Sequence, residues 1–406
     1  MTGSEAPGLL AGTRVVDLAG EALTYAGRMF ADLGADVILV EPTSGTEARH
    51  VPPLVTMTDG VAVSAHFAFM AAGKRSLALD TAVPAGRAIL DRLVQVVDIV
   101  LVPGDLDERR NRGLDPATVR ALSDRVIVTS VTAFGSDGPR RHWRGSDMIG
   151  WATSGAMYGI GDPDRPPVAP GGGLADAAAA LNAAMGSMLA LRARQRNGGT
   201  GQVVDISQQE AVLSVSMEAG PLLTMEGQPQ QRAGRRRMAA HGVFPVQDGM
   251  VEIVAFLPTQ WDAMAEWLHD ELGIEEVMMD EFRGGSASRF LYSDLIEGWV
   301  LELCSRYTKQ DFFHEAQRRR VPCGSINSAA DLLTDPHLDA VGAWVDVAHP
   351  EVASVRLPRA PVRIDGVAAP VGAVPGIGEH TDTVLREVLG ATDREIAARR
   401  ADGTIA

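Results

Sequence analysis

The residues ADVILV at positions 35–40 are apolar apart from Asp36, a composition typical of a strand that is buried on both faces. Two similar runs follow, DIVLV at 98–102 and VIVTSV at 126–131. Segments of helical composition, 85–97 and 114–122, stand between or beside these runs. The alternation predicts an α/β domain built on a parallel, doubly wound sheet.

The pattern extends in both directions from this centre. Upstream, 14–18 is predicted to form a strand and 25–33 a helix, and 75–79 is a further candidate strand. Downstream, the Gly- and Pro-rich segment 161–173 must be irregular, and it leads into an Ala/Leu/Met-rich helix at 176–194. A strand at 203–206 and a helix at 208–225 complete this part of the chain.

A change of composition at Glu226–Ala240, where Gln, Gly and Arg dominate, indicates a linker. Beyond it we expect a strand at 249–256 and three helices at 259–272, 293–304 and 309–319. The Pro-rich stretch 349–370 is predicted to be extended and to lead into a final helix at 381–389. The predicted organisation is a large domain (1–225), the linker (226–240), a small α+β domain (241–345) and a return segment (346–406) that completes the large domain.

The composition narrows the class of protein. The chain has 406 residues and a net charge of −15, which argues against binding to nucleic acid. No uninterrupted apolar run approaches the roughly 20 residues of a membrane span, and no secretory signal is visible. With two cysteines, a disulfide framework is not expected, and no Cys/His group has metal-ligand spacing. We therefore expect a cytoplasmic protein without a metal or a membrane partner.

The first strand and helix could belong to a dinucleotide-binding fold, in which a Gly-rich turn lets a pyrophosphate approach the helix. The turn here, AGEALTYAG at 19–27, lacks the three-glycine spacing and carries the bulky residues Leu23 and Tyr25. The sequence therefore predicts the fold without a nicotinamide or flavin cofactor.

A series of short segments, in order along nearly the whole chain, resembles the type III (CaiB/BaiF-like) CoA-transferases. The segments are Val15–Leu18, ADLGADVILVEP (31–42), GKRSL (73–77), FGSDGP (134–139), GDPDRPPVAP (161–170), Asp176 with its helix, TGQVVDISQQEAV (200–212), VPCG (321–324), DPHL (335–338) and GEHTDTVL (378–385). The resemblance implies a Rossmann-like large domain closed by the C-terminal segment, a smaller domain, and an interlocked, ring-like homodimer.

The resemblance also implies the chemistry: transfer of coenzyme A between an acyl-CoA thioester and a free carboxylic acid. In this family an Asp at a helix start carries the acyl group and then CoA, as a mixed anhydride and a thioester, and here that residue is Asp176. A carboxylate can act in this way because it forms both adducts without a metal or redox cofactor. From the residues alone, the favoured interpretation of Asp176 is the N-cap of its helix.

Further site residues follow from the same resemblance. Lys74 and its neighbour Arg75, in GKRSL, and Arg144 are implied to contact CoA, whose phosphates require cations. Asp147 matches an acidic residue near the nucleophile. The alternatives are a solvated turn for Lys74, an exposed loop for Arg144 and a helix cap for Asp147.

Two other functions remain open at this point. The family's Asn-Phe-x-Pro-Gly signature is replaced by PGDLD at 103–107, which is compatible with a non-catalytic or weakly active subunit of a hetero-oligomeric transferase. Acyl-CoA racemases of the same superfamily use a His–Asp pair for proton transfer. Ser146 occupies the position of that histidine, which disfavours the racemase.

Overall fold

The computed structural model describes residues 8–18, 21–57, 60, 62–216, 219–232, 240–283, 286–366 and 370–406. The chain divides into two compact units. The first unit comprises 1–156, 169–221 and 339–406, and the second comprises 157–168 and 222–338. Part of the predicted linker, 233–239, lies outside the described residues, as do Ala19 and Gly20 of the turn at 19–27.

The first unit is organised around a six-stranded parallel sheet, which confirms the predicted α/β fold. Its strands, in chain order, are β1 (Arg14–Asp17), β2 (Asp36–Glu41), β5 (Arg75–Ala78), β6 (Ile99–Val102), β7 (Ile127–Thr132) and β8 (Val203–Ser207). The spatial order is β5-β2-β1-β6-β7-β8, so the direction of winding reverses between β1 and β6. This is the strand order of dinucleotide-binding folds, in which ligands bind beyond the carboxyl ends of the strands.

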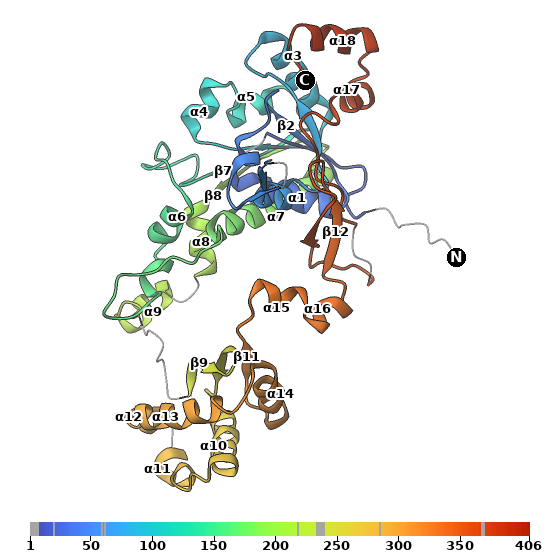
Figure 1. Cartoon of the computed structure of the whole chain (residues 1–406). Coiled ribbons are helices and arrows are strands. Elements are labelled where there is room, and N and C mark those ends of the chain that lie inside the picture. Colours follow the sequence, from blue (N-terminus) through green and yellow to red (C-terminus); the bar gives the residue numbers. More distant parts are fainter. Residues whose placement is uncertain are drawn as a thin grey trace. The chain divides into compact units, whose positions relative to one another are not determined.

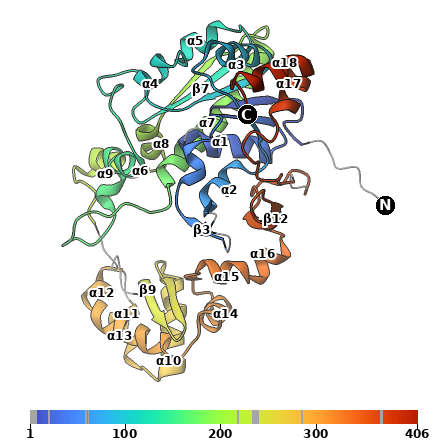
Figure 2. The same cartoon turned by 45° about the horizontal axis from the view of Figure 1, so that its top comes forward.

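Neighbouring residues along these strands belong to different hydrophobic clusters. Val16 and Val100 pack in a cluster with residues of α3 (Pro84–Val96) and α17 (Thr381–Leu389). Val15 and Ile99 pack in a second cluster with residues of α1 (Glu21–Asp32) and α7 (Leu174–Arg196). Since successive side chains of a strand point to opposite faces, both faces of the sheet are covered. Figures 1 and 2 show α1 beside α7, and α17 beside α3.

Shorter elements complete the first unit. Its other helices are α2 (Ala65–Ala71), α4 (Leu106–Asn111), α5 (Pro116–Ala121), α6 (Asp147–Thr153), α8 (Gln208–Val215) and α18 (Asp393–Ala401), with the 3₁₀ turn η1 (Glu47–His50). Two hairpins are formed by β3 (Leu54–Thr56) with β4 (Ala62–Ser64), and by β12 (Trp344–Ala348) with β13 (Ser354–Pro358). The 3₁₀ turn η2 (Ala156–Gly159) and helix α9 (Ala219–Glu226) lie where the chain passes between the units.

Residues 339–406 return to the first unit and bind the edge of the sheet. The Thr381 hydroxyl accepts a hydrogen bond from the amide of Ala78, and the amide of Gly378 donates to the Ser76 hydroxyl. Two sequence predictions need correction here. The helix expected at 208–225 is divided into α8 and α9, and α18 follows the helix that was expected to be the last. The stretch 349–370, which was expected to be extended, contains the strand β13.

The second unit has its own sheet and core. Strands β9 (His241–Val246), β10 (Gly249–Val254) and β11 (Cys323–Ser325) form an antiparallel sheet in the order β11-β10-β9. The helices are α10 (Pro258–Leu272), α11 (Asp280–Arg283), α12 (Ser286–Leu291), α13 (Ser293–Cys304), α14 (Lys309–Arg319), α15 (Ala329–Leu333) and α16 (Pro336–Ala340), with the 3₁₀ turn η3 (Glu276–Met278). Trp261, Trp267 and Phe312 are fully buried at the centre of this unit.

Helix α7 is apolar on all sides. Among the described residues it is the one helix that is long and apolar enough to cross a membrane, a test that the core helix of a soluble protein also passes. Its small residues, among them Ala179, Ala183 and Ser187, are buried within the first unit, where α7 contacts α1 and β7. Its large residues Leu181, Met185 and Leu189 are exposed on the other side.

Candidate active site

A pocket of about 1290 Å³ lies at the carboxyl ends of the six parallel strands of the first unit. The end of each strand contributes to its wall: Leu18 after β1, Glu41 at the end of β2, Leu79 after β5, Pro103 after β6, Thr132 at the end of β7 and Gln208 after β8. Loops between strands and helices supply the remaining wall. This is the position at which parallel α/β sheets bind their ligands.

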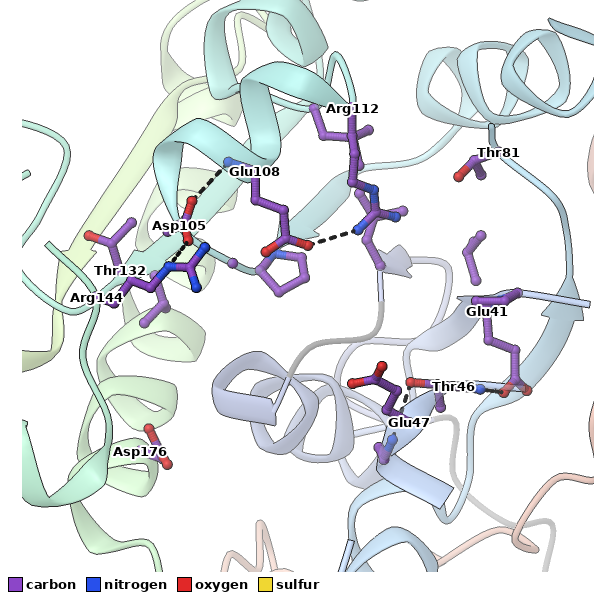
Figure 3. Close-up of a pocket in the computed structure, with 18 of the residues that line it drawn as sticks. Glu41, Thr46, Glu47, Thr81, Asp105, Glu108, Arg112, Thr132, Arg144 and Asp176 are labelled. Carbon is purple, nitrogen blue, oxygen red and sulfur yellow. Dashed lines mark hydrogen bonds and ion pairs between the residues drawn. The ribbon is translucent and has the colours of Figure 1, made fainter. Parts of the chain in front are cut away.

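Asp176 lines this pocket from the third position of α7. The N-cap of α7 is Gly173, so the interpretation of Asp176 as an N-cap is wrong. The side chain is half-buried, and its Oδ1 accepts a hydrogen bond of 2.5 Å from Nε2 of Gln208. Figure 3 shows Asp176 extending from the first turn of the helix beside the pocket. The helix dipole favours the ionised carboxylate at this position.

Asp147 begins α6 and also lines the pocket, close to Asp176. Its Oδ1 accepts hydrogen bonds from the amides of Ala175, at 2.7 Å, and Asp176, at 3.3 Å. These are orphan amides at the start of α7, and Gly173 has no side chain with which to satisfy them. Asp147 therefore caps α7, whereas the sequence suggested a cap for its own helix.

The glycines at 171–173 leave open space in front of α7. Gly172 and Gly173 have φ values of +84° and +69°, a left-handed conformation that favours glycine. A Cβ atom added at any of the three positions would meet no atom within 4 Å. No neighbouring side chain therefore blocks the approach of a ligand to the backbone that precedes Asp176.

Two arginines in the pocket wall form weak ion pairs with carboxylates. Nε of Arg144 lies 3.3 Å from Asp105, and Nη1 of Arg112 lies 3.5 Å from Glu108 (Figure 3). The Arg144 side chain is 87% exposed. Solvent-exposed ion pairs contribute about 0–1 kcal/mol, so an anionic ligand can displace the carboxylate partners. The pocket wall contains more carboxylates than arginines, and its arginines are Arg112, Arg144 and Arg141. These guanidinium groups are the cations of the wall that an anionic ligand could contact.

The structure does not bring Lys74 and Arg75 to the wall of this pocket. The Lys74 ammonium is fully buried, 2.7 Å from Oδ2 of Asp17. Burial lowers the pKa of Lys74, an effect that the negative charge of Asp17 opposes. Arg75 makes two hydrogen bonds to Asp36, at the amino end of β2, and a third to Glu387. Contact of Lys74 and Arg75 with CoA stays a prediction.

The sequence did not single out Gln208 or Arg112 as site residues. Gln208 follows β8 directly, and a polar residue at the carboxyl end of a parallel strand is a usable signal. Arg112 lies in the connection after β6, next to the altered PGDLD segment. Both residues line the pocket together with Asp147, Arg144 and Asp176.

Comparisons with known proteins identify the family of the chain. The model of CoA-transferase family III matches residues 10–381. The chain is 30% identical to the succinyl-CoA–D-citramalate CoA-transferase of Chloroflexus aurantiacus, with 100% of both chains covered. It is 33% identical to the BbsE subunit of the succinyl-CoA:(R)-benzylsuccinate CoA-transferase of Thauera aromatica, over 92% of this chain and 93% of that protein.

A solved structure gives the same result for the fold. The crystal structure of a CaiB/BaiF family protein from Brucella suis superimposes with a TM-score of 0.83 and 28% sequence identity. The match covers 94% of this chain and 100% of the other. The family model, the full-length relatives and this structure together show that the chain belongs to CoA-transferase family III.

Proposed function

We propose that this protein transfers coenzyme A from an acyl-CoA thioester to a free carboxylic acid, with Asp176 as the nucleophile. The observation that carries the proposal is the placement of Asp176 in the pocket, on the first turn of α7, in a family of CoA-transferases. Succinyl-CoA is the first donor to test, because it is named as the CoA donor of the two relatives described above.

The reaction follows from the chemistry of a carboxylate nucleophile. Asp176 attacks the thioester carbonyl, the carbon–sulfur bond breaks, and a mixed anhydride and CoA thiolate result. The thiolate then attacks Cγ of Asp176, which releases the donor acid and leaves an aspartyl-CoA thioester. The acceptor carboxylate attacks the same Cγ and displaces the thiolate, which attacks the acceptor carbonyl of the new anhydride. The products are the new acyl-CoA and free Asp176.

The test is direct capture of the intermediate. Purified protein mixed with succinyl-CoA and quenched rapidly should carry CoA on the peptide that contains Asp176, detected by mass spectrometry. Hydroxylamine should remove the adduct, because it cleaves thioesters and anhydrides. Protein that binds succinyl-CoA or other acyl-CoA donors without forming any adduct would contradict the proposal and favour a subunit without catalytic activity.

The cysteines are poor candidates for the acyl carrier. Burial raises the pKa of the Cys304 thiol to about 12 and that of Cys323 to about 11. Because the thiolate is the nucleophilic form, either residue would be almost entirely unreactive near pH 7. Asp176 is the better candidate because it lines the pocket and a carboxylate can form both adducts.

Arg144 and Arg112 are proposed to bind the phosphates of CoA. We expect Arg144→Ala to raise KM for acyl-CoA about tenfold with little change in kcat, because a charge-assisted hydrogen bond contributes about 1.5–3 kcal/mol. Steady-state kinetics measures this effect. Arg110→Ala is the matched control, since Arg110 is 68% exposed and is paired only weakly with Asp107. An equal rise in KM in both variants would show a general charge effect instead of a phosphate contact.

The exposed face of α7 is proposed to be the interface of a dimer. Leu181, Met185 and Leu189 recur every four residues, so they form one stripe on the helix. A helix that is apolar on all sides is usually buried on all sides, and a second copy of the chain would cover this stripe. An interlocked homodimer is the proposed form. A heteromer is the alternative, since several relatives are named as subunits.

We expect Met185→Glu to convert the assembly to monomers or to reduce its stability strongly, because the charge would be buried in the interface. Light scattering coupled to size-exclusion chromatography measures the mass. Val96→Glu places the same charge on an exposed apolar residue of α3, away from α7, and should leave the mass unchanged. A monomeric wild-type protein would refute the interface.

A further inference from the structure

Gln208 is buried beside Asp176, although its own helix does not need its side chain. It is the first residue of α8 and is 5% exposed. The N-cap of α8 is Ser207, whose hydroxyl accepts the hydrogen bond from the amide of Glu210. Nε2 of Gln208 instead donates to Oδ1 of Asp176 at 2.5 Å. A buried amide is therefore committed to one oxygen, Oδ1, of the proposed nucleophile.

The surrounding backbone holds this amide in place. Ser207 pairs with Thr132 across β7 and β8, which fixes the start of α8. Gly150 of α6 packs against the amide group: a Cβ at that position would lie 3.0 Å from Cδ and Oε1 of Gln208. The same Cβ would lie 3.2 Å from Cβ of Ala175. The three helix starts at α6, α7 and α8 therefore enclose the Gln208 amide and the Asp176 carboxylate.

We propose that Gln208 is a catalytic residue that directs attack through Oδ2 of Asp176 and stabilises the oxyanion that forms on Oδ1. This inference rests on the proposed function, in which Asp176 is the nucleophile. With Oδ1 engaged by Gln208, Oδ2 becomes the bridging oxygen of the anhydride. Oδ1 then becomes the carbonyl oxygen of the aspartyl group, still in hydrogen-bonding position to Nε2.

The hydrogen bond from Gln208 to Oδ1 stabilises the transition state in some steps of the reaction but not in others. When CoA thiolate attacks Cγ of the anhydride, the electron pair of the Cγ–Oδ1 double bond moves onto Oδ1. It returns as the Cγ–Oδ2 bond breaks and the donor acid leaves. Attack of the acceptor carboxylate on the aspartyl thioester places the same charge on Oδ1 before the thiolate leaves. In the first and last steps the negative charge develops on the oxygen of the substrate carbonyl instead. The hydrogen bond from Gln208 to Oδ1 does not stabilise that charge.

Gln208→Leu removes the donor with little change of volume. Loss of one oxyanion donor typically costs about 100- to 1000-fold in rate, so formation of the aspartyl-CoA thioester should slow by that factor. Release of free CoA in the first step should slow much less. In a single turnover followed by rapid quench, free CoA thiol should therefore accumulate and persist in the variant, whereas in wild type it should be consumed quickly.

Gln208→Glu adds a pH-dependent readout. An ionised Glu at this position would repel Asp176, whereas its protonated form can donate to Oδ1. Transfer by this variant should therefore rise as the pH falls, relative to wild type, because glutamine does not titrate. Gln208→Leu should lack this rise. A role that is only structural would not predict it, and thermal unfolding of each variant checks that the fold is intact.

The outcomes separate the two proposals. A wild-type protein that forms no adduct on Asp176 removes the proposed function. A wild-type adduct, combined with Gln208→Leu forming the thioester at the wild-type rate, removes the role of Gln208 alone. Equal slowing of CoA release and thioester formation, or Gln208→Glu with a pH profile parallel to that of wild type, also overturns the inference. Selective slowing of the thioester step supports it.

Discussion

Asp176→Ala is expected to lose at least about 1000-fold in CoA transfer while the protein folds normally. Removal of the nucleophile deletes the covalent pathway, and the binding groups that remain cannot replace it. The variant should lose some stability but still fold, because the charge-assisted hydrogen bond to Gln208 contributes about 1.5–3 kcal/mol. The measurement is the rate of new acyl-CoA formation at saturating donor and acceptor, with thermal unfolding as the check on folding.

The matched control is Asp124→Ala, which makes the same chemical change at a fully exposed carboxylate. Asp124 is 3.7 Å from Arg120, in the connection between α5 and β7, and does not line the pocket. It should keep wild-type activity. Asp176→Ala retaining near wild-type transfer would refute the nucleophile. A loss of activity accompanied by unfolding in Asp176→Ala would require the direct search for an adduct in the wild-type protein.

The central strands of the large sheet could be predicted to within one residue. β2, β6 and β7 are buried on both faces, so their sequences are short, nearly continuous apolar runs that few other structures produce. The hairpin of β3 and β4 gives no such pattern, because β3 is exposed along its length and pairs only with β4. The sequence therefore could not indicate it.

Helix α18 can be predicted from its N-terminal capping residues, although not from hydrophobic periodicity. Its sequence is polar and only Ile396 is buried, so hydrophobic periodicity does not reveal it. The residues Thr392 and Glu395 form a capping box, which the spacing Thr-x-x-Glu predicts. The terminal helix could therefore have been placed by its cap, although not by its core.

Two parts of the candidate site could be predicted. The resemblance named individual residues, and the ends of the predicted strands located the edge of the sheet at which a ligand would bind. Asp176 and Asp147 are brought together, as expected for neighbours at one site. The contact between Asp147 and the amides of α7 depends on the loop geometry at Gly173, which no sequence pattern specifies. The hydrogen bond of Gln208 likewise joins residues 32 positions apart through the packing of three helix starts.

Packing explains why lysine, and not arginine, stands at positions 74 and 309 of this Arg-rich chain. Lys74 and Lys309 are both buried, and each places its ammonium 2.7 Å from an Asp carboxylate. An ammonium is a compact point charge, whereas a guanidinium is a broad planar group. The space at Lys74 is narrow: a Cβ added at Gly27 would lie 2.9 Å from Nζ and 2.4 Å from Oδ2 of Asp17. Lys74 thus lies at a tightly packed site.

We expect Lys74→Met to reduce the free energy of unfolding by about 3–5 kcal/mol. The substitution leaves the carboxylate of Asp17, which is fully buried, without the ammonium that lies 2.7 Å away. Lys309→Met is the matched control, since Lys309 pairs with an Asp331 side chain that is 37% exposed, and it should cost only about 1 kcal/mol. Urea denaturation followed by circular dichroism measures both variants.

The double variant Asp17→Asn/Lys74→Met separates packing from ligand binding. If the pair acts structurally, removal of both charges should recover a large part of the stability lost in Lys74→Met, because no isolated charge remains buried. If Lys74 binds a phosphate of CoA, both variants should instead share a raised KM for acyl-CoA at nearly unchanged stability. The complete burial of the ammonium favours the first outcome, because a phosphate could reach Nζ only after the ion pair with Asp17 had opened.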